Sequence, residues 1–331
     1  MVDLGRDLLN PRYMETPGAY RWWYFDAYDE AMQNAWVAIF FVGSVFSPEY
    51  GARRGTDRNR RPIDHAAVNF AWYRRGHRPR WVFSEYPAAK VLIRENEISI
   101  GDSSVRFSEN EALVSIRESE IPTRRPFVAD MRVVRQEAPL PAEYLELDPG
   151  HEWKAHMPKM AATISIGSKT FHANGYHDEN RGLIPLSDSF RTWSWGRFHR
   201  PEGTKVFFDL EMRRAHDARK RFAIDHHGLE TMITNEPRPT KLSLTHFLAP
   251  LPKSTHAWSE GGKALDVVPE WYVEKAPFYS RFVGGLRLGG TSLNHGMCEH
   301  IAFDRVTHPL VQKMIRGRVS WPERNEWGWV P

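Results

Sequence analysis

This sequence has little cysteine and no long apolar run. Its 331 residues include one cysteine, Cys298, which excludes an intramolecular disulfide and a thiolate-cluster metal site. The longest apolar run extends from Ala35 to Phe46 and is shorter than the roughly 18 residues of a membrane-spanning helix. The N-terminal segment carries acids and no apolar core, so we expect no signal peptide. These absences predict a cytoplasmic protein.

The signatures of several enzyme classes are absent as well. Two Gly-Gly pairs near the C-terminus lack the spacing of a nucleotide-binding loop, and no serine-centred nucleophile elbow occurs. His151 and His156 are separated by the same interval as His172 and His177. On a strand this interval puts the two histidines of each pair on opposite faces, which is unsuitable for a shared metal ion. We therefore expect no metal and no cofactor.

Basic residues gather in three segments, although the whole chain is nearly balanced in charge. Lysine and arginine number 45 against 41 acids, for a net charge of +4. The clusters at 53–61, 74–80 and 213–221 lie in Gly-, Pro- or Asp-containing stretches between apolar runs, where solvated loops are expected. We therefore expect no nucleic-acid partner. Attraction to anionic lipids leaves peripheral membrane association open, and the sequence does not indicate an oligomeric state.

Short strands of alternating polarity dominate the chain. The predicted strands are 36–46, 66–73, 80–85, 91–100, 104–107, 112–117, 160–166, 170–176, 192–199, 205–213, 221–225, 229–234 and 241–247. Gly167-Ser168 is expected to form the turn of the hairpin 160–176. One helix is predicted to begin at Pro309 and to end at Gly317.

The acidic, proline-rich segment 137–150 is the best candidate for a domain boundary. A chain of this length also exceeds what one core comfortably holds. We therefore predict an all-β protein with two β domains in tandem, residues 1–140 and 150–331, and a short C-terminal helix. Periodicity leaves open whether each domain is a β-barrel or a β-sandwich.

Two constellations of possible catalytic residues follow this boundary. In an extended chain His151 and Trp153 share one face, and so do Tyr176 and Asp178. An acid beside an aromatic ring on an inward face is unusual in a structural core. The simpler interpretation is a surface turn at 176–180 that is capped by Asp178. The pattern alone leaves both interpretations open.

Five segments carry a family resemblance, in the same order along the chain. They are RWWYFD at 21–26, FVGSVFSPEY at 41–50, DHAAVNFAWY at 64–73, HEWKAHMP at 151–158 with GYHDEN at 175–180, and EHIAFDR at 299–305. They resemble the carotenoid 1,2-hydratases (hydroxyneurosporene synthases) and their lipocalin-like relatives. Arg21 replaces the family's usual acid, and Arg181 stands where an aromatic residue is commoner. Lys154-Ala155-His156 alters the continuation of the family's H-x-W motif. These departures put the substrate in question more than the fold.

The resemblance implies two lipocalin-like domains and a cofactor-independent hydratase. Its expected substrate is the terminal trisubstituted alkene of an acyclic carotenoid or similar long isoprenoid. Asp178 matches the family's functional carboxylate and is the candidate proton donor. A free aspartate is protonated only about one part in a thousand at pH 7, so the chemistry requires a buried acid. Trp153 and Tyr176 are candidates for stabilising a carbocation, and His151 for orienting Asp178 or accepting a proton from water.

Further residues are candidates for substrate contacts. They are Trp23, Tyr24, His177, Asn180, Trp193 and Trp195. For Trp23, Tyr24 and the tryptophans at 193 and 195, packing in a core or domain seam is the simpler interpretation.

Two other functions compete with hydration. The first is a cofactor-free cyclase of a polyene, either a terpenoid cyclase or a Diels–Alderase-type pericyclase, because the wider superfamily contains such enzymes. A pericyclase would not need an ionisable Asp178. The second is a hydrophobic-ligand carrier, which needs aromatic residues but no buried acid. The sequence does not decide between a carotenoid, a squalene-like chain and a polyketide.

Overall fold

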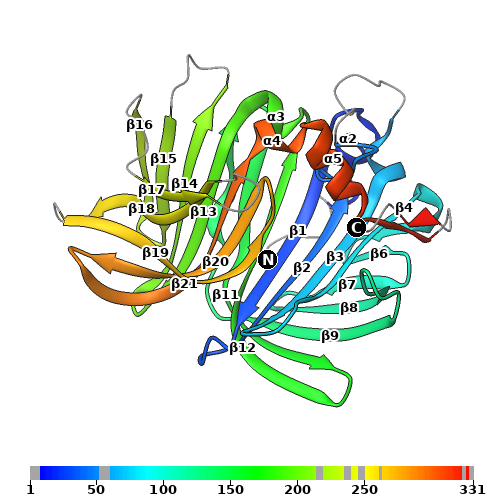
Figure 1. The fold of residues 1–331 in the computed structure, drawn as a ribbon, viewed down its shortest axis with the longest axis horizontal. Helices are drawn as coiled ribbons and strands as arrows, with labels where there is room; N and C mark the ends of the chain where they lie inside the picture. The colour runs from blue at the N-terminus through cyan, green and yellow to red at the C-terminus, as the bar shows by residue number, and fades with distance from the viewer. Residues whose placement is uncertain are drawn as a thin grey trace. The chain divides into compact units, whose positions relative to one another are not determined.

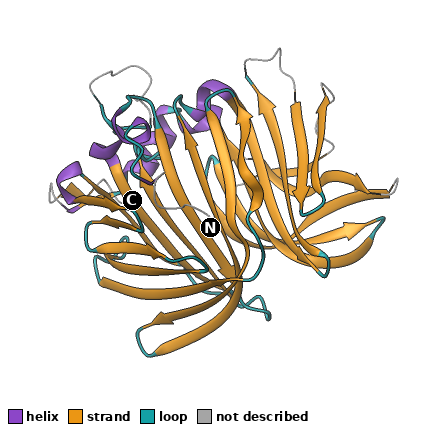
Figure 2. Cartoon of the chain, turned by 180° about the vertical axis from the view of Figure 1, so that it is seen from behind, coloured by secondary structure: helices purple, strands orange, loops and turns teal. Residues whose placement is uncertain are grey.

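The computed structural model describes residues 8–51, 60–213, 219–234, 240–244, 250–260, 263–322 and 326–327. Strands account for 64% of the structure and helices for 11%, which confirms the predicted all-β class (Figure 2). The chain divides into two compact units, residues 1–185 with 312–331 and residues 186–311. Within the described ranges, no helix is long and apolar enough to cross a membrane.

The first unit is built on a 14-stranded sheet (Figure 1). Its main path runs β23-β22-β4-β3-β2-β1-β12-β11-β9-β8-β7-β6-β5, and β10 pairs with β11. The strands are β1 (Tyr20–Tyr28), β2 (Asn34–Val42), β3 (Ala66–Arg74), β4 (Arg80–Tyr86), β5 (Val91–Arg94), β6 (Glu97–Ile100), β7 (Ser103–Phe107), β8 (Glu111–Ser119), β9 (Pro126–Arg135), β10 (Leu140–Asp148), β11 (His151–Ile166), β12 (Lys169–Gly182), β22 (Ser320–Trp321) and β23 (Glu326–Trp327). Helical segments in this part are α2 (Arg12–Glu15) and the 3-10 turns Pro62–His65 and Ala88–Lys90.

This sheet curls so that β7 to β9 cross over β1 and β2 (Figure 1). The apolar core fills the space between the crossing strands, with Phe25 and Phe40 on one side and Val114 and Phe127 on the other. Because strand residues alternate between faces, the core takes every second residue of β1. The intervening residues of β1 point to the opposite face of the sheet.

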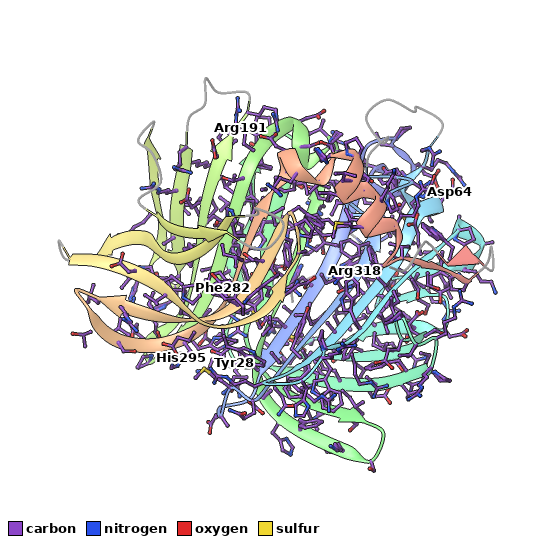
Figure 3. The ribbon with its side chains drawn as sticks, in the orientation of Figure 1. Tyr28, Asp64, Arg191, Phe282, His295 and Arg318 are labelled. Atoms are coloured by element: carbon purple, nitrogen blue, oxygen red, sulfur yellow. The ribbon has the colours of Figure 1, made fainter. Side chains whose placement is uncertain are left out.

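The second unit is built on a nine-stranded sheet in the order β16-β15-β14-β13-β21-β20-β19-β18-β17. Its strands are β13 (Phe190–Arg200), β14 (Gly203–Met212), β15 (Arg219–Asp225), β16 (Gly228–Thr234), β17 (Thr240–Leu244), β18 (Pro250–Glu260), β19 (Lys263–Lys275), β20 (Tyr279–Leu288) and β21 (Thr291–Ala302), with the short helices α3 (Leu186–Ser189) and α4 (Phe303–Val306). Phe207, Cys298 and Phe282, the last labelled in Figure 3, belong to its apolar core.

The structure refines several predicted boundaries. Helix α5 (Pro309–Arg316) confirms the predicted C-terminal helix. The predicted strand 91–100 is instead a hairpin of β5 and β6, and residues 245–247 of another predicted strand lie outside the described residues. The segment 137–150 contains β10, which pairs with β11 inside the first unit. A boundary between independently folding domains at 137–150 stays a prediction.

Candidate active site

Strand β12 lies in the first sheet between β1 and β11 (Figure 1). Residues that lie directly opposite each other on antiparallel strands point to the same face. The register pairs Asp178 with Tyr24, Tyr176 with Asp26, and Asn180 with both Trp22 and Trp153. One face of three adjacent strands therefore brings the candidate catalytic residues of the two sequence segments together.

The surface-turn interpretation of residues 176–180 is wrong. The segment lies within β12 and is hydrogen-bonded to a strand on each side. Tyr176 is fully buried, Asp178 is 4% exposed and Asn180 is 5% exposed. A carboxyl group at such a position must be held by hydrogen bonds, because burial of an unpartnered acid is costly.

Asp178 accepts hydrogen bonds from three neighbouring side chains. The Trp153 indole Nε1 and the Tyr176 hydroxyl each donate to Asp178 Oδ2 over 2.8 Å. Asn180 Nδ2 donates to Oδ1 over 3.3 Å. Burial and the neighbouring Asp178 carboxylate raise the pKa of Tyr176 well above its ordinary value, so its hydroxyl remains a donor. The sequence pattern predicts that Tyr176 and Asp178 share a face, and the structure adds Trp153 from the other constellation, in direct contact with Asp178.

A second carboxyl group on this face, that of Asp26, was not predicted from the sequence. Asp26 is fully buried and lies opposite Tyr176, and its charge contributes to the raised pKa of Tyr176. Tyr24, two positions earlier on β1, packs edge-on against Tyr176 with ring centroids 6.3 Å apart. An acid inside the aromatic-rich segment 20–28 is the signal that could have identified Asp26.

His151 is held at the end of the same face by Tyr20. The Tyr20 hydroxyl is hydrogen-bonded to His151 Nδ1, and both residues lie opposite Gly182 of β12. A Cβ atom at Gly182 would approach the Tyr20 ring to 2.6 Å, so this contact requires glycine there. Gly182 lies about 13 Å along β12 from Asp178, given the rise of a strand. The predicted role of His151 in orienting Asp178 stays a prediction.

The structure places Trp23 and His177 on the core face, opposite to Asp178. The His177 ring stacks on Phe25 with centroids 4.0 Å apart, and its Nδ1 is hydrogen-bonded to the Tyr24 carbonyl over 2.9 Å. Burial, with a smaller effect from His156, lowers the pKa of His177 to about 3. His177 is therefore a neutral core residue, and substrate contacts by Trp23 and His177 stay predictions.

The two arginines that depart from the family pattern have acidic partners. Arg21 Nε donates to Glu179 Oε1 over 2.6 Å, and both side chains are buried. Burial acts to raise the pKa of Glu179, but Arg21 and His156 outweigh it and lower that pKa to about 2. Arg181 Nε donates to Glu152 Oε2 over 2.6 Å. Both arginines are thus part of ion pairs in the first unit.

Trp193 and Trp195 belong to the second unit. They lie on the same face of β13 and are 6% and 4% exposed. The Trp193 ring packs edge-on against Phe208 at 5.3 Å between centroids. Their predicted contact with substrate stays a prediction.

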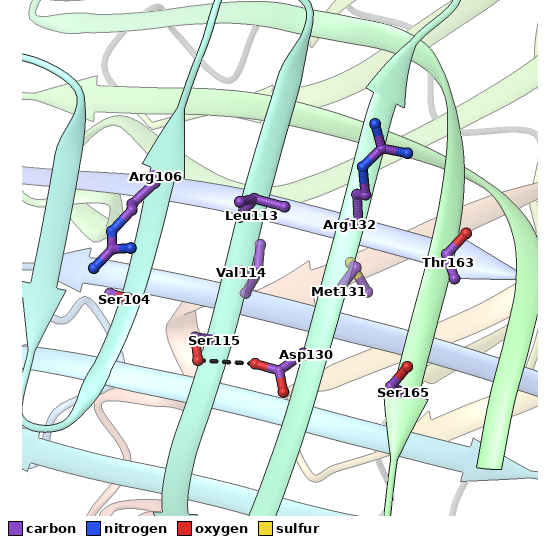
Figure 4. Close-up of a pocket in the computed structure, with 10 residues that line it drawn as sticks. All are labelled: Ser104, Arg106, Leu113, Val114, Ser115, Asp130, Met131, Arg132, Thr163 and Ser165. Atoms are coloured by element: carbon purple, nitrogen blue, oxygen red, sulfur yellow. Dashed lines mark hydrogen bonds between the residues drawn. The ribbon is translucent and has the colours of Figure 1, made fainter. Parts of the chain in front are cut away.

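A surface depression of about 340 Å³ lies elsewhere in the first unit, over β7, β8, β9 and β11 (Figure 4). Its exposed side chains are tied together: Ser115 Oγ donates to Asp130 Oδ1 over 2.9 Å, and Arg117 pairs with the same carboxylate. None of the predicted site residues lines it. This depression is therefore separate from the Asp178 face.

Across the described ranges, no group of three or more His, Cys, Asp or Glu side chains could hold a metal ion. The donors around Asp178 are an indole, a phenol and an amide. These groups suit a carboxyl group that handles a proton better than they suit a cation.

Comparison with known proteins connects this fold and site to one family. The acyclic carotenoid 1,2-hydratase of Thiocapsa roseopersicina is 29% identical over 92% of this chain and 73% of its own length. A crystal structure from Nitrosomonas europaea named after AttH covers 86% of this chain and 92% of its own, with TM-score 0.61 and 13% identity. Kievitone hydratase from Nectria haematococca covers 91% of this chain and 93% of its own, with TM-score 0.54 and 9% identity. These structures share the lipocalin-like fold.

The sequence model of the family described as carotenoid hydratase CrtC matches residues 38–330. This range includes His151, Trp153, Tyr176 and Asp178, and it begins after the segment that contains Asp26. The chain therefore belongs to the carotenoid hydratase CrtC family.

Proposed function

We propose that this protein is a hydratase that adds water to the terminal trisubstituted alkene of an acyclic carotenoid or a similar long isoprenoid. Its family membership and its carotenoid-hydratase relative support the reaction class. The observation that carries the mechanism is the buried Asp178, whose Oδ2 accepts hydrogen bonds from Trp153 and Tyr176. The proposed reaction uses no cofactor.

Asp178 supplies the proton in the first step. The π electrons of the alkene form a new C–H bond at the less substituted carbon, and a tertiary carbocation is left at the other carbon. Water then forms a C–O bond to the cation, and the proton released from that water returns to the Asp178 carboxylate. The catalyst is regenerated, and the net change is the addition of one water molecule.

The groups around Asp178 suit the two charged species of this cycle, the carboxylate and the carbocation. Trp153 and Tyr176 donate to the carboxylate that forms when the proton leaves, which stabilises it. Their aromatic rings are fully buried and adjacent to the acid. A desolvated cation–π contact contributes about 2 kcal/mol, so two such contacts would accelerate ionisation about a thousandfold. His151, held by Tyr20, is the further candidate base for the attacking water.

Cyclisation of a polyene is the competing proposal, because the same proton transfer could start it. Hydration increases the mass of the substrate by one water molecule, whereas cyclisation gives an isomer of unchanged mass. A carrier gives no product. Association with membranes, where long isoprenoids dissolve, stays a prediction.

The test is to incubate the purified protein with an acyclic carotenoid in ¹⁸O-labelled water, with and without a chelator. We expect a hydrated product that carries the label, at the same rate in both samples. An unlabelled isomer would favour the cyclase, and activity that the chelator abolishes and zinc restores would contradict cofactor independence.

A further inference from the structure

Asn180 is a polar neighbour of Asp178. One end of the Asn180 side-chain amide is hydrogen-bonded and, within the part of the chain that the structure describes, the other end is not. Its Nδ2 donates to Asp178 Oδ1 over 3.3 Å. Its Oδ1 is buried and has no hydrogen-bond partner among the described residues. An amide carbonyl can accept two hydrogen bonds, and a buried acceptor is normally satisfied. The vacant acceptor next to the acid therefore calls for a donor that the protein itself does not supply.

The neighbouring side chains that could donate are directed elsewhere. Trp153 lies opposite Asn180 on β11, but the only N–H group of its side chain donates to Asp178 Oδ2. The Tyr176 hydroxyl donates to the same Oδ2. Trp22 lies opposite Asn180 on β1, so the amide is positioned between two indole-bearing strands. A molecule bound at Asn180 Oδ1 is thus next to aromatic rings of the kind that suit a carbocation.

The hydrogen bonds also indicate which oxygen of Asp178 carries the transferable proton. Oδ2 accepts from Trp153 and Tyr176, as the carbonyl oxygen of a neutral carboxyl group can. A protonated Asp178 with these bonds intact carries its proton on Oδ1. Because Asn180 Nδ2 also donates to Oδ1, that proton points away from the amide. The proton of Asp178 and the Oδ1 atom of Asn180 are therefore adjacent, but they are not hydrogen-bonded to each other.

We propose that Asn180 is a catalytic residue that holds the attacking water through its Oδ1 atom while its Nδ2 atom orients the Asp178 acid. This inference rests on the proposed hydration and assigns the capture of the carbocation. The water donates one hydrogen to Asn180 Oδ1, which leaves an oxygen lone pair for the new C–O bond. When the bond forms, its proton passes to the Asp178 carboxylate, so one amide side chain places the acid and the nucleophile together.

The test separates proton transfer from water capture. In D₂O, a cation that is not captured by water loses a proton and returns deuterium-labelled alkene. The measured quantity is the ratio of deuterium in recovered alkene to hydrated product. We expect Asn180→Leu, which removes the acceptor, to raise this ratio about tenfold or more. Asn180→Asp retains an oxygen acceptor and should keep the ratio close to that of the wild type.

Asn69→Leu is the matched control, because Asn69 is also a buried strand asparagine on this sheet, with Nδ2 donating to the Val82 carbonyl over 3.1 Å. It should lower the melting temperature and leave the ratio unchanged. If Asn180→Leu does not fold, Asn180→Ala removes the same acceptor with less crowding and carries the test. If Asn180→Leu lowers deuterium exchange and hydration by the same factor, so that the ratio is unchanged, the proposed role of Asn180 is wrong. A wild-type protein that neither hydrates nor exchanges would instead refute the proposed function.

Discussion

Buried titratable groups on the two faces of β12 have opposite environments. On one face, Asp178 is surrounded by hydrogen-bond donors that stabilise its charged form and leave one oxygen for a proton. On the other face, His177 is stacked on Phe25 in the apolar core and remains neutral. Sequence alternation predicts that neighbouring residues face opposite ways. It does not predict that both faces of this strand are buried, because that depends on the layers packed around it.

The buried neutral His177 should make the stability of the protein sensitive to acid. Its pKa is about 3 in the folded state and about 6.5 in the unfolded state. Between these values the unfolded state binds more protons, so the free energy of unfolding falls as the pH falls. The expected slope is roughly 1 kcal/mol per pH unit for this one group. Chemical denaturation between pH 6.5 and pH 5 would measure it.

His177→Phe should make that slope shallower, because it removes the group that titrates on unfolding. His226→Phe is the control, since His226 lies exposed in a turn, and it should leave the slope as it is. Glu179, whose pKa is lowered to about 2, adds a further loss of stability only below about pH 4.5. Identical slopes for the wild type and His177→Phe would show that His177 is not a neutral core residue.

At the level of elements, two β-bulges bring Trp153 to Asp178. Near the turn of the β11–β12 hairpin, Met160 pairs with Gly175, but Met157 pairs with His177 and Ala155 with Asp178. Each irregularity shifts the register by one residue, and together they preserve which residues share a face. A regular hairpin would have placed Met157 opposite Asp178. The sequence predicts the turn at Gly167-Ser168, and Pro158 is a signal for the irregularity between Met157 and Met160. It carries no comparable signal for the irregularity between Ala155 and Met157.

Strands β1 and β5–β6 show why other elements were harder to predict. Strand β1 is buried on both faces, so its apolar and aromatic residues do not alternate with exposed polar ones, and the sequence predicts no strand there. The segment 91–100 alternates throughout but turns between Arg94 and Glu97. Alternation was not a sufficient signal either: β9 alternates between exposed and buried residues but was not predicted, and the turn within 91–100, which lacks glycine and proline, was missed.

Gly182 of β12 lies opposite Tyr20 of β1 and His151 of β11, at the His151 end of the site. Gly182→Ala would place a Cβ atom 2.6 Å from the Tyr20 ring, which must then move away from His151. We expect a loss of stability of about 1–3 kcal/mol from this crowding, together with lower activity. Thermal unfolding and product formation would measure the two effects.

Gly76→Ala is the control variant, because it introduces backbone strain without crowding. Gly76 has a φ of +76°, and an added Cβ atom there meets nothing within 4 Å. That variant should lose about 1 kcal/mol from its backbone conformation and keep its activity. Unchanged activity and stability in Gly182→Ala would contradict the described Tyr20–His151 contact.

At the level of the whole molecule, the two compact units do not follow the local composition of the chain. The proline- and acid-rich segment 137–150 is compatible with a linker, yet most of it forms β10. The units divide between Pro185 and Leu186, and residues 312–331 belong with the N-terminal part of the chain. Local sequence carries no signal for such a return, because it is decided by contacts between distant segments.

Cys298 offers a direct probe of the second unit. It is the only cysteine in the sequence and is fully buried in the core with Phe207 and Phe282. We expect a thiol reagent to label the native protein only at the rate at which this core opens. Labelling followed by mass spectrometry across a denaturant series should coincide with unfolding of the unit. Rapid, complete labelling of native protein would contradict the buried position of Cys298.

The proposed chemistry depends most directly on the proton carried by Asp178. Asp178→Asn keeps the size of the side chain and removes that proton, and Asp130→Asn changes an exposed aspartate of the same sheet. The decisive measurement is the rate of hydrated product formation by both variants on an acyclic carotenoid. We expect Asp178→Asn to lose activity by a factor of about 100 to 10,000 with little change in melting temperature, and Asp130→Asn to match the wild type. Hydration by Asp178→Asn at a rate near that of the wild type would contradict the assignment of Asp178 as the proton donor.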